Sequence, residues 1–237
     1  MTMYEEKRKI PWVNGLKGVA CLIVFAHHFA NSFFPSTFSG LASESRTVSG
    51  FDTTFAFKPY GILLNGNFAV TLFVVLSAFL FAGKAMENTL LEMKQDVFKT
   101  CTRRYLTLML NTAVVSYFYY FLSWILTKLN LNYMNYFPGA KLKSFPVHIL
   151  FLQWVTEDSS IVGPLWTMKI FLIGSFIALF LGMWSSKNRW YMPFVYFVIA
   201  FPLGYLYPYY FAVMMGVTLA DLYFFDRVEQ YRKFLLN

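Results

Sequence analysis

The hydropathy pattern divides the chain into six long apolar segments separated by polar connections. An α-helix needs about 20 consecutive apolar residues to cross a bilayer. The segments that approach this length are 12–34, 66–83, 105–127, 164–184, 190–207 and 209–225. The pattern therefore predicts an all-α fold, a polytopic integral membrane helix bundle with about six transmembrane helices.

Two of the connections are long. The segment 35–65 is rich in Ser, Thr and Gly, and the segment 130–163 contains two prolines and one short apolar stretch, 147–155. That stretch is too short to span, so it is expected to dip into the membrane or to lie on its surface. No stretch has the composition of a soluble domain. Residues 1–237 are therefore predicted to form a single transmembrane domain.

The composition supports a membrane protein. Hydrophobic residues make up 57% of the chain, charged residues only 14%, and the mean hydropathy is +0.48. These values exclude an ordinary soluble domain. A net charge of +8 could indicate a nucleic-acid partner, but the basic residues lie in the connections between apolar segments. We therefore predict membrane lipid as a partner and no nucleic acid.

The basic residues also predict the orientation, because cytoplasmic connections carry an excess of Lys and Arg. With the N-terminus inside, thirteen basic residues fall on the cytoplasmic side, five fall outside, and Lys17 and Lys169 lie within segments. The thirteen are Lys7, Arg8, Lys9, Lys84, Lys94, Lys99, Arg103, Arg104, Lys187, Arg189, Arg227, Arg232 and Lys233. Both termini are therefore expected in the cytoplasm, and Asp221 is expected at the cytoplasmic interface.

Ionisable groups lie inside the first apolar segment. Ionisable side chains in a span are costly, so they indicate a functional site by default. Lys17 and His28 are eleven residues apart, almost three helical turns, and so project from one helix face about 16 Å apart. His27 lies about a quarter-turn away from that face. In the alternative interpretation, Lys17 snorkels to the headgroups and the histidines sit near the far interface.

The histidines and cysteines do not have metal-binding spacing. Cys21 and Cys101 form no Cys-x-x-Cys pair, and the adjacent His27 and His28 point in divergent directions on a helix. No metal site is predicted, and no tightly bound cofactor.

Three strings resemble a known family. Residues 10–29 contain Gly-Leu-Lys-Gly, and ten residues separate its Lys from a following His. Residues 67–80 contain Phe-Val-Val-Leu-Ser-Ala-Phe. Residues 163–175 contain Leu-Trp-Thr-Met, then Gly-Ser. These strings resemble the membrane-bound acyltransferase 3 family, which has Gly-Leu-Arg-Gly, ten residues and a catalytic His, then Phe-Phe-Val-Leu-Ser-Gly-Phe and Leu-Trp-Thr-Leu. Lys17 stands at the arginine position and His28 at the histidine position.

The resemblance also marks packing positions and a basic pair. It implies motif or packing roles for Ser77, Trp166, Thr167, Gly174 and Ser175. Family members have a basic pair where Arg103 and Arg104 precede the third segment. Guanidinium groups suit phosphate recognition, so these two arginines are candidates for gripping the phosphates of acyl-coenzyme A. The alternative is that they only anchor the third helix at the membrane surface.

The resemblance implies an integral membrane O-acyltransferase of the cell (plasma) membrane. Such an enzyme moves an acyl group, most often acetyl, from cytoplasmic acyl-CoA (acetyl-CoA) to a hydroxyl of a cell-surface glycan or similar acceptor. His28 and Lys17 are the catalytic candidates, with His28 as a general base or acyl relay. Phe171 occupies the family's glutamate position, and family members usually have about ten spans. The chain is thus expected to lack the family's C-terminal helices, and the alternative is a catalytically silent or truncated membrane relative that acts as a partner protein.

The orientation can be tested with reporter fusions at residues 50, 90, 145 and 237. The distribution of Lys and Arg predicts that these positions report outside, inside, outside and inside, in that order. An external signal from residue 90 would contradict the predicted orientation.

Overall fold

The computed structural model describes residues 10–56, 58–87, 90–129, 145–147, 149–150 and 163–236. The chain divides into two compact units, Met1–Leu76 and Ser77–Asn237. The boundary between them falls inside helix α3 (Gly66–Glu87). Every regular element in the described ranges is helical, so the predicted all-α class is confirmed.

The first unit is built on α1 (Pro11–Phe33). Its proline at the first helical turn fixes φ and needs no hydrogen-bond donor there. The small residue Ala20, with Ile23, packs against Ala69 at the start of α3. Short helical turns follow α1 and lead into α3. They are α2 (Ser36–Ser39), η1 (Ala42–Glu44), η2 (Phe51–Phe55) and η3 (Pro59–Leu64).

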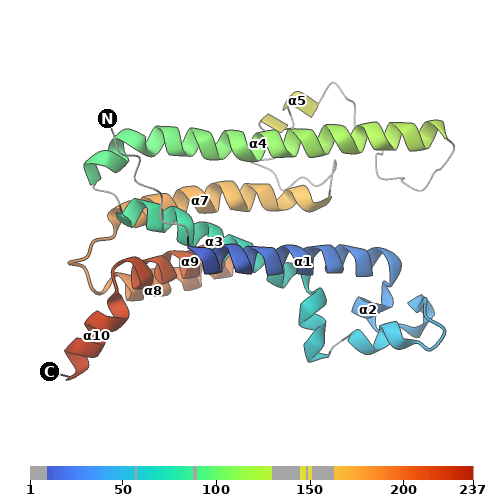
Figure 1. Cartoon of the computed structure of the whole chain (residues 1–237), viewed down its shortest axis with the longest axis horizontal. Helices are drawn as coiled ribbons and strands as arrows, with labels where there is room; N and C mark the ends of the chain where they lie inside the picture. Colours follow the sequence, from blue (N-terminus) through green and yellow to red (C-terminus); the bar gives the residue numbers. More distant parts are fainter. Residues whose placement is uncertain are drawn as a thin grey trace. The chain divides into compact units, whose positions relative to one another are not determined.

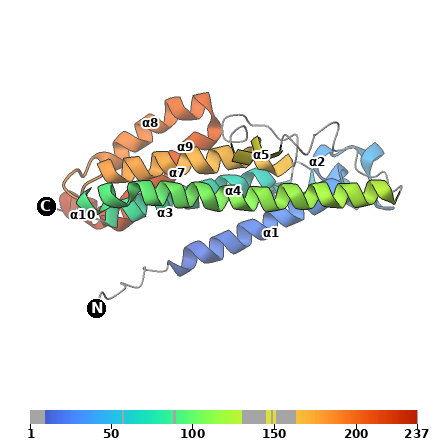
Figure 2. The same ribbon diagram turned by 90° about the horizontal axis from the view of Figure 1, so that it is seen from above.

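The second unit contains the long helix α4 and the helices that follow it (Figures 1 and 2). Its elements are the rest of α3, α4 (Leu90–Lys128), α5 (Phe145–Val147), η6 (Gly163–Trp166), α7 (Thr167–Trp184), α8 (Met192–Leu206), α9 (Pro208–Phe224) and α10 (Arg227–Leu236). Helix α9 packs against both α7 and α8, and α4 packs against α7.

Glycines allow α7 to approach its neighbours closely. A Cβ atom on Gly182 would lie 2.6 Å from the Ala82 carbonyl oxygen of α3, and one on Gly174 would lie 2.7 Å from Val213 Cγ2 of α9. Small residues at such crossings let membrane helices approach closely. Gly174 therefore lies at a close contact between α7 and α9.

All six predicted segments contain helices, but the number of spans is not confirmed as six. Four helices are long and apolar enough to cross a membrane: α1, α3, the Asp96–Lys128 part of α4, and α7. Helices α8 and α9 have 15 and 17 residues. At 1.5 Å per residue they extend about 23 and 26 Å, less than the roughly 30 Å of a hydrocarbon core.

Helix α4 begins well before the predicted segment 105–127. It starts at Leu90 and includes the charged stretch that the sequence assigned to a connection. Hydropathy detects only the apolar part of such a helix, whereas Lys, Glu, Gln and Met are good helix formers that extend it. Arg103 and Arg104 therefore lie within a helix and not in the loop before one.

A buried ion pair joins the last two helices. Asp221 near the end of α9 accepts a hydrogen bond of 2.7 Å from Nε of Arg227 at the start of α10, and both side chains are fully buried. Asp221 also accepts a hydrogen bond from the Ser185 hydroxyl. Asp226, with φ of 51°, turns the chain between the two helices. Asp221 is thus buried within the protein, and its predicted position at the cytoplasmic interface stays a prediction.

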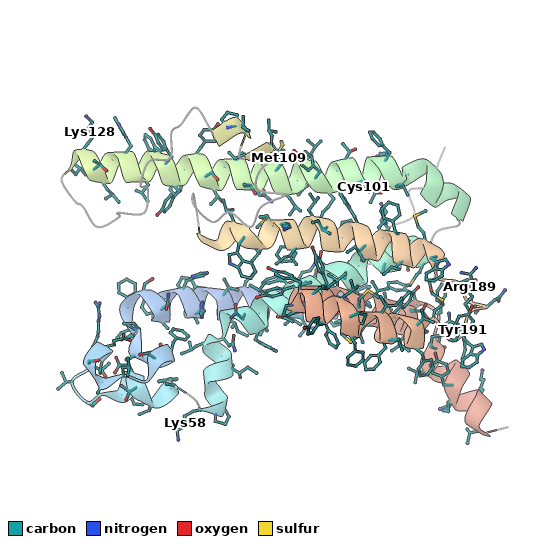
Figure 3. The ribbon with its side chains drawn as sticks, turned by 180° about the vertical axis from the view of Figure 1, so that it is seen from behind. Lys58, Cys101, Met109, Lys128, Arg189 and Tyr191 are labelled. Carbon is teal, nitrogen blue, oxygen red and sulfur yellow. The ribbon has the colours of Figure 1, made fainter. Side chains whose placement is uncertain are left out.

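The rest of the Arg227 guanidinium is held by the connection between α7 and α8. Nη1 donates to the Lys187 carbonyl and Nη2 to the Ser186 carbonyl, both at 2.7 Å, and Nη2 also reaches the Arg189 carbonyl at 3.3 Å. Arg189 and Tyr191 mark this connection in Figure 3. The Arg227 side chain therefore ties α9, α10 and the α7–α8 connection together.

Removing the charge of Asp221 should destabilise the second unit. Asp221→Asn leaves the buried guanidinium uncompensated, at a cost of about 3–5 kcal/mol. The measurement is thermal unfolding of the purified protein in detergent, where the apparent Tm should fall. Glu229→Gln is the matched control, because Glu229 pairs with Arg232 at 2.9 Å near the surface and such pairs contribute at most about 1 kcal/mol. Equal Tm values for both variants would contradict the structural role of the pair.

Candidate functional site

Helix α1 carries both residues proposed as catalytic from the sequence. Lys17 is half-buried, and His28 is exposed. The helix is continuous from Pro11 to Phe33, so the eleven-residue spacing places the two side chains on one helix face, as predicted. Their catalytic roles stay a prediction.

The neighbouring His27 is more tightly held than His28. Its Nδ1 lies 2.8 Å from the carbonyl oxygen of Leu64. A carbonyl oxygen only accepts, so Nδ1 carries the proton of the neutral ring and Nε2 is the hydrogen-bond acceptor. The ring also packs edge-on against Phe38, with 5.0 Å between ring centroids, and against His28, with 5.3 Å.

His27 lines a cavity of about 500 Å³ within the first unit. The other wall residues come from the short turns between α1 and α3 and from the start of α3. They are Thr37, Phe38, Phe55, Ala56, Lys58, Pro59, Gly61, Ile62, Leu64, Asn65 and Asn67. The walls combine apolar and aromatic side chains with the polar residues His27, Thr37, Lys58, Asn65 and Asn67. The volume is in the range of small-molecule sites.

The turns that form this cavity are fixed by a buried carboxylate. Asp52 accepts hydrogen bonds from the Ser45 hydroxyl at 2.5 Å, the Thr47 hydroxyl at 2.7 Å and the Arg46 amide at 2.8 Å. Burial raises the pKa of Asp52, but the hydrogen bonds from Ser45, the Arg46 amide and Thr47 outweigh it and hold the pKa well below its ordinary value. The carboxylate is therefore charged at neutral pH and holds the connection in one conformation.

In the second unit, Arg104 brings two of the sequence motifs together. Its Nη2 donates to the Ser77 hydroxyl of α3 at 2.9 Å, and its Nε donates to the Ser175 hydroxyl of α7 at 3.1 Å. The guanidinium also lies 4.9 Å from the centroid of the Phe81 ring. Cys101 and Met109 mark this part of α4 in Figure 3. Arg104 thus bridges α3, α4 and α7.

The groups that hold Arg104 are all neutral. Among the described residues, no carboxylate forms an ion pair with its guanidinium, and Nη1 makes no hydrogen bond. A cation in a membrane helix without a counter-ion is costly, and such residues are typical of functional sites. The arrangement can therefore bind an anion.

A second cation, Lys84 of α3, contacts α4 one helical turn away from Arg104. Lys84 Nζ of α3 donates to the Thr100 hydroxyl of α4 at 2.6 Å, and Thr100 precedes Arg104 by four residues. Thr100 and Arg104 therefore share one face of α4, which meets α3. This places two basic side chains, Lys84 and Arg104, along the α3–α4 contact.

Arg103 does not join this cluster. Consecutive residues of a helix project about 100° apart, and Arg103 is exposed whereas Arg104 is half-buried. Arg103 lines a separate shallow groove of about 430 Å³ on α4, together with Phe98, Lys99 and Leu106. The two arginines that the sequence paired as phosphate ligands thus face different surroundings.

The remaining motif residues lie along η6 and α7. The Trp166 ring packs against Tyr209 of α9 with 5.3 Å between centroids, and Thr167 is buried at the start of α7. Ser175 also donates to the Phe171 carbonyl at 2.5 Å. Trp166 and Thr167 therefore hold the end of α7 that leads to Ser175.

Phe171, at the family's glutamate position, lies in an apolar cluster. Its neighbours in this cluster include Tyr105, Leu108, Met109 and Leu172. No carboxylate can act from this position in the present sequence. The site therefore lacks an acid, base or charge partner there.

Sequence reasoning missed two residues of these clusters. His28 and not His27 matches the motif position, and no sequence signal marks the contact of Gly66 with His27: a Cβ atom on Gly66 would lie 2.6–3.0 Å from the His27 ring. Lys84 was counted only as a topological charge, although it follows Ser77 by two helical turns. Within the described residues, no group of three His, Cys, Asp or Glu could hold a metal ion. His148 lies outside the described residues.

Comparison with known proteins gives one match. A family model of acyltransferase family 3, described as an acyltransferase domain, matches residues 10–234, nearly the whole chain. No curated protein and no solved structure matches the chain.

Proposed function

Because the chain belongs to acyltransferase family 3, we propose that it is an integral membrane O-acyltransferase of the plasma membrane with both termini in the cytoplasm. It takes an acyl group, acetyl in the first instance, from acyl-CoA and transfers it to a hydroxyl of a cell-surface carbohydrate. The observation that carries this proposal is the Arg104 cluster, in which a half-buried guanidinium donates to two serine hydroxyls and, among the described residues, pairs with no carboxylate.

Arg104 and Lys84 recognise the phosphates of the donor. A guanidinium binds phosphate oxygens through two parallel N–H groups, and an ammonium adds a point charge. The Ser77 and Ser175 hydroxyls orient Arg104, and the Thr100 hydroxyl orients Lys84. In the proposed orientation this cluster is on the cytoplasmic half of the helices, where acyl-CoA is available. Arg103 anchors α4 and has no donor contact.

His28 is the catalytic histidine of the proposed reaction. As a general base it takes the proton of the acceptor hydroxyl, or as a relay it carries the acyl group between donor and acceptor. Lys17 stands at the position of the family arginine on the same helix face and supplies the positive charge, although an ammonium lacks the bidentate fork of a guanidinium. With Phe171 at the glutamate position, we expect slow transfer, because no carboxylate from this position stabilises a protonated imidazole.

The second candidate function is a catalytically silent relative that acts as a partner protein. The packing of Phe171 in an apolar cluster favours it, because that position has a structural use in this chain. This candidate keeps the helix-packing motifs and loses the chemistry.

The two functions are separated by transfer of labelled acetyl from acetyl-CoA to an oligosaccharide acceptor in proteoliposomes. We expect the parent to transfer slowly and His28→Ala to lose about 100-fold or more, the usual effect of removing a general base. His148→Ala is the matched control and should keep the parental rate. Lys17→Arg restores the family residue and should transfer at least as fast as the parent.

If the parent transfers acetyl and His28→Ala does so at the same rate, the catalytic role of His28 is contradicted. Absence of transfer from the parent, His148→Ala and Lys17→Arg alike would favour the silent relative.

A further inference from the structure

The cavity beside His27 has the features of a binding site, and most of its wall residues lie outside the acyltransferase motifs. It lies within the first unit, between the end of α1, the turns that follow it and the start of α3. Its walls combine the rings of Phe38 and Phe55 with the amides of Asn65 and Asn67. Aromatic faces and amide groups together are suited to a small polar molecule that has both C–H faces and hydroxyls.

His27 presents a defined acceptor at this cavity. Because Nδ1 donates to the Leu64 carbonyl, the ring cannot rotate freely, and in the neutral ring the other nitrogen, Nε2, is a hydrogen-bond acceptor. A hydrogen-bond acceptor of this kind binds a ligand that donates, such as a hydroxyl group. The His27 ring also packs edge-on against the Phe38 ring, and this contact limits its movement.

Gly66 keeps the His27 ring accessible. A Cβ atom at this position would lie 3.0 Å from Nε2 and 2.6 Å from Cδ2. Any larger residue would press on the edge of the ring that carries the acceptor nitrogen and displace it. The backbone conformation of Gly66 is helical, so the glycine is required here for space and not for an unusual φ.

The charges around the cavity favour a ligand with a negative group. The ionisable side chains among its described wall residues are His27 and Lys58, and neither can be negative. Lys58 is an exposed wall residue on the connection before η3, labelled in Figure 3. The nearby carboxylate of Asp52 is occupied by the hydroxyls of Ser45 and Thr47 and by a backbone amide.

We propose that this cavity binds the acyl acceptor, a hydroxyl-bearing ligand of monosaccharide size that carries a carboxylate. Nε2 of His27 accepts a hydrogen bond from an acceptor hydroxyl, and Lys58 pairs with the carboxylate. His27 is a binding residue, next to His28 in the chain, and the role of the ligand as acceptor rests on the proposed function.

The experiment uses the full chain in nanodiscs and two matched probes, D-glucuronate and D-glucose, which differ in one carboxylate. Binding is measured by saturation-transfer NMR without any acyl donor. We expect the parent to bind glucuronate at least tenfold more tightly than glucose. Lys58→Ala should abolish this preference, and His27→Asn and Gly66→Ala should weaken binding of both sugars about tenfold or more.

Arg46→Ala is the matched control, because Arg46 is the other cation of the same connection and does not line the cavity. It should bind both sugars as the parent does. Equal binding of the two sugars by the parent, or binding that His27→Asn and Lys58→Ala leave unchanged, would overturn the proposal. Because no donor is present, sugar binding with no acetyl transfer would refute the proposed function and keep the cavity as a site.

Transfer kinetics provide a second measurement. With glucuronate as acceptor, His27→Asn should raise the acceptor KM about tenfold, whereas His28→Ala should lower kcat. A fall in kcat without a change in KM for His27→Asn would overturn the binding role of His27.

Discussion

The guanidinium of Arg104 imposes the strongest constraint on the helices around it, because it places a cation inside an apolar helix assembly. Three helices meet at this side chain, and two of them do so through serine hydroxyls that belong to separate sequence motifs. Hydroxyls can orient a guanidinium but cannot neutralise it. Contacts within the described part of the protein therefore do not offset the desolvation free energy of the Arg104 guanidinium.

Arg227 shows what a structural arginine looks like in the same unit. It is fully buried, pairs with the carboxylate of Asp221 and donates to backbone carbonyls of the α7–α8 connection. Arg227 thus has a counter-ion and several acceptors, whereas Arg104 has neither a described counter-ion nor an acceptor for Nη1. Because of this difference, we assign Arg227 to stability and propose that Arg104 binds an anionic ligand.

The sequence predicts the helices well and their contacts less well. Apolar periodicity and length located all six helical segments, because burial in lipid selects long apolar runs. It missed the start of α4 at Leu90, where helix propensity and not hydropathy decides the structure. It could not separate Arg103 from Arg104, since only the neighbours of α4 determine which of two adjacent side chains is buried. The sequence also does not predict the pairing of Asp221 with Arg227, because the pairing depends on the turn at Asp226.

The motifs predicted the elements of the site but not the groups that hold them. Ser77 and Ser175 were identified as packing positions, and the structure shows that both also accept hydrogen bonds from Arg104. His28 was selected by its spacing from Lys17, whereas the histidine that lines a cavity is His27. The orientation of the His27 ring depends on the Leu64 carbonyl. Every residue has a backbone carbonyl, so the sequence does not indicate which one contacts His27.

The role of Arg104 is tested most directly by the binding of coenzyme A to the purified protein, comparing Arg104→Met with Arg103→Met. Methionine is apolar and similar in length, so it removes the charge without opening a large gap, and apolar replacement of a buried ion is often neutral for stability. Hydrogen bonds to charged groups contribute about 1.5–3 kcal/mol, which corresponds to roughly 10- to 100-fold in Kd. We predict that Arg104→Met weakens coenzyme A binding by this factor at an unchanged Tm, while Arg103→Met binds like the parent. Equal Kd values for the parent and Arg104→Met, or an equal loss in Arg103→Met, would contradict it.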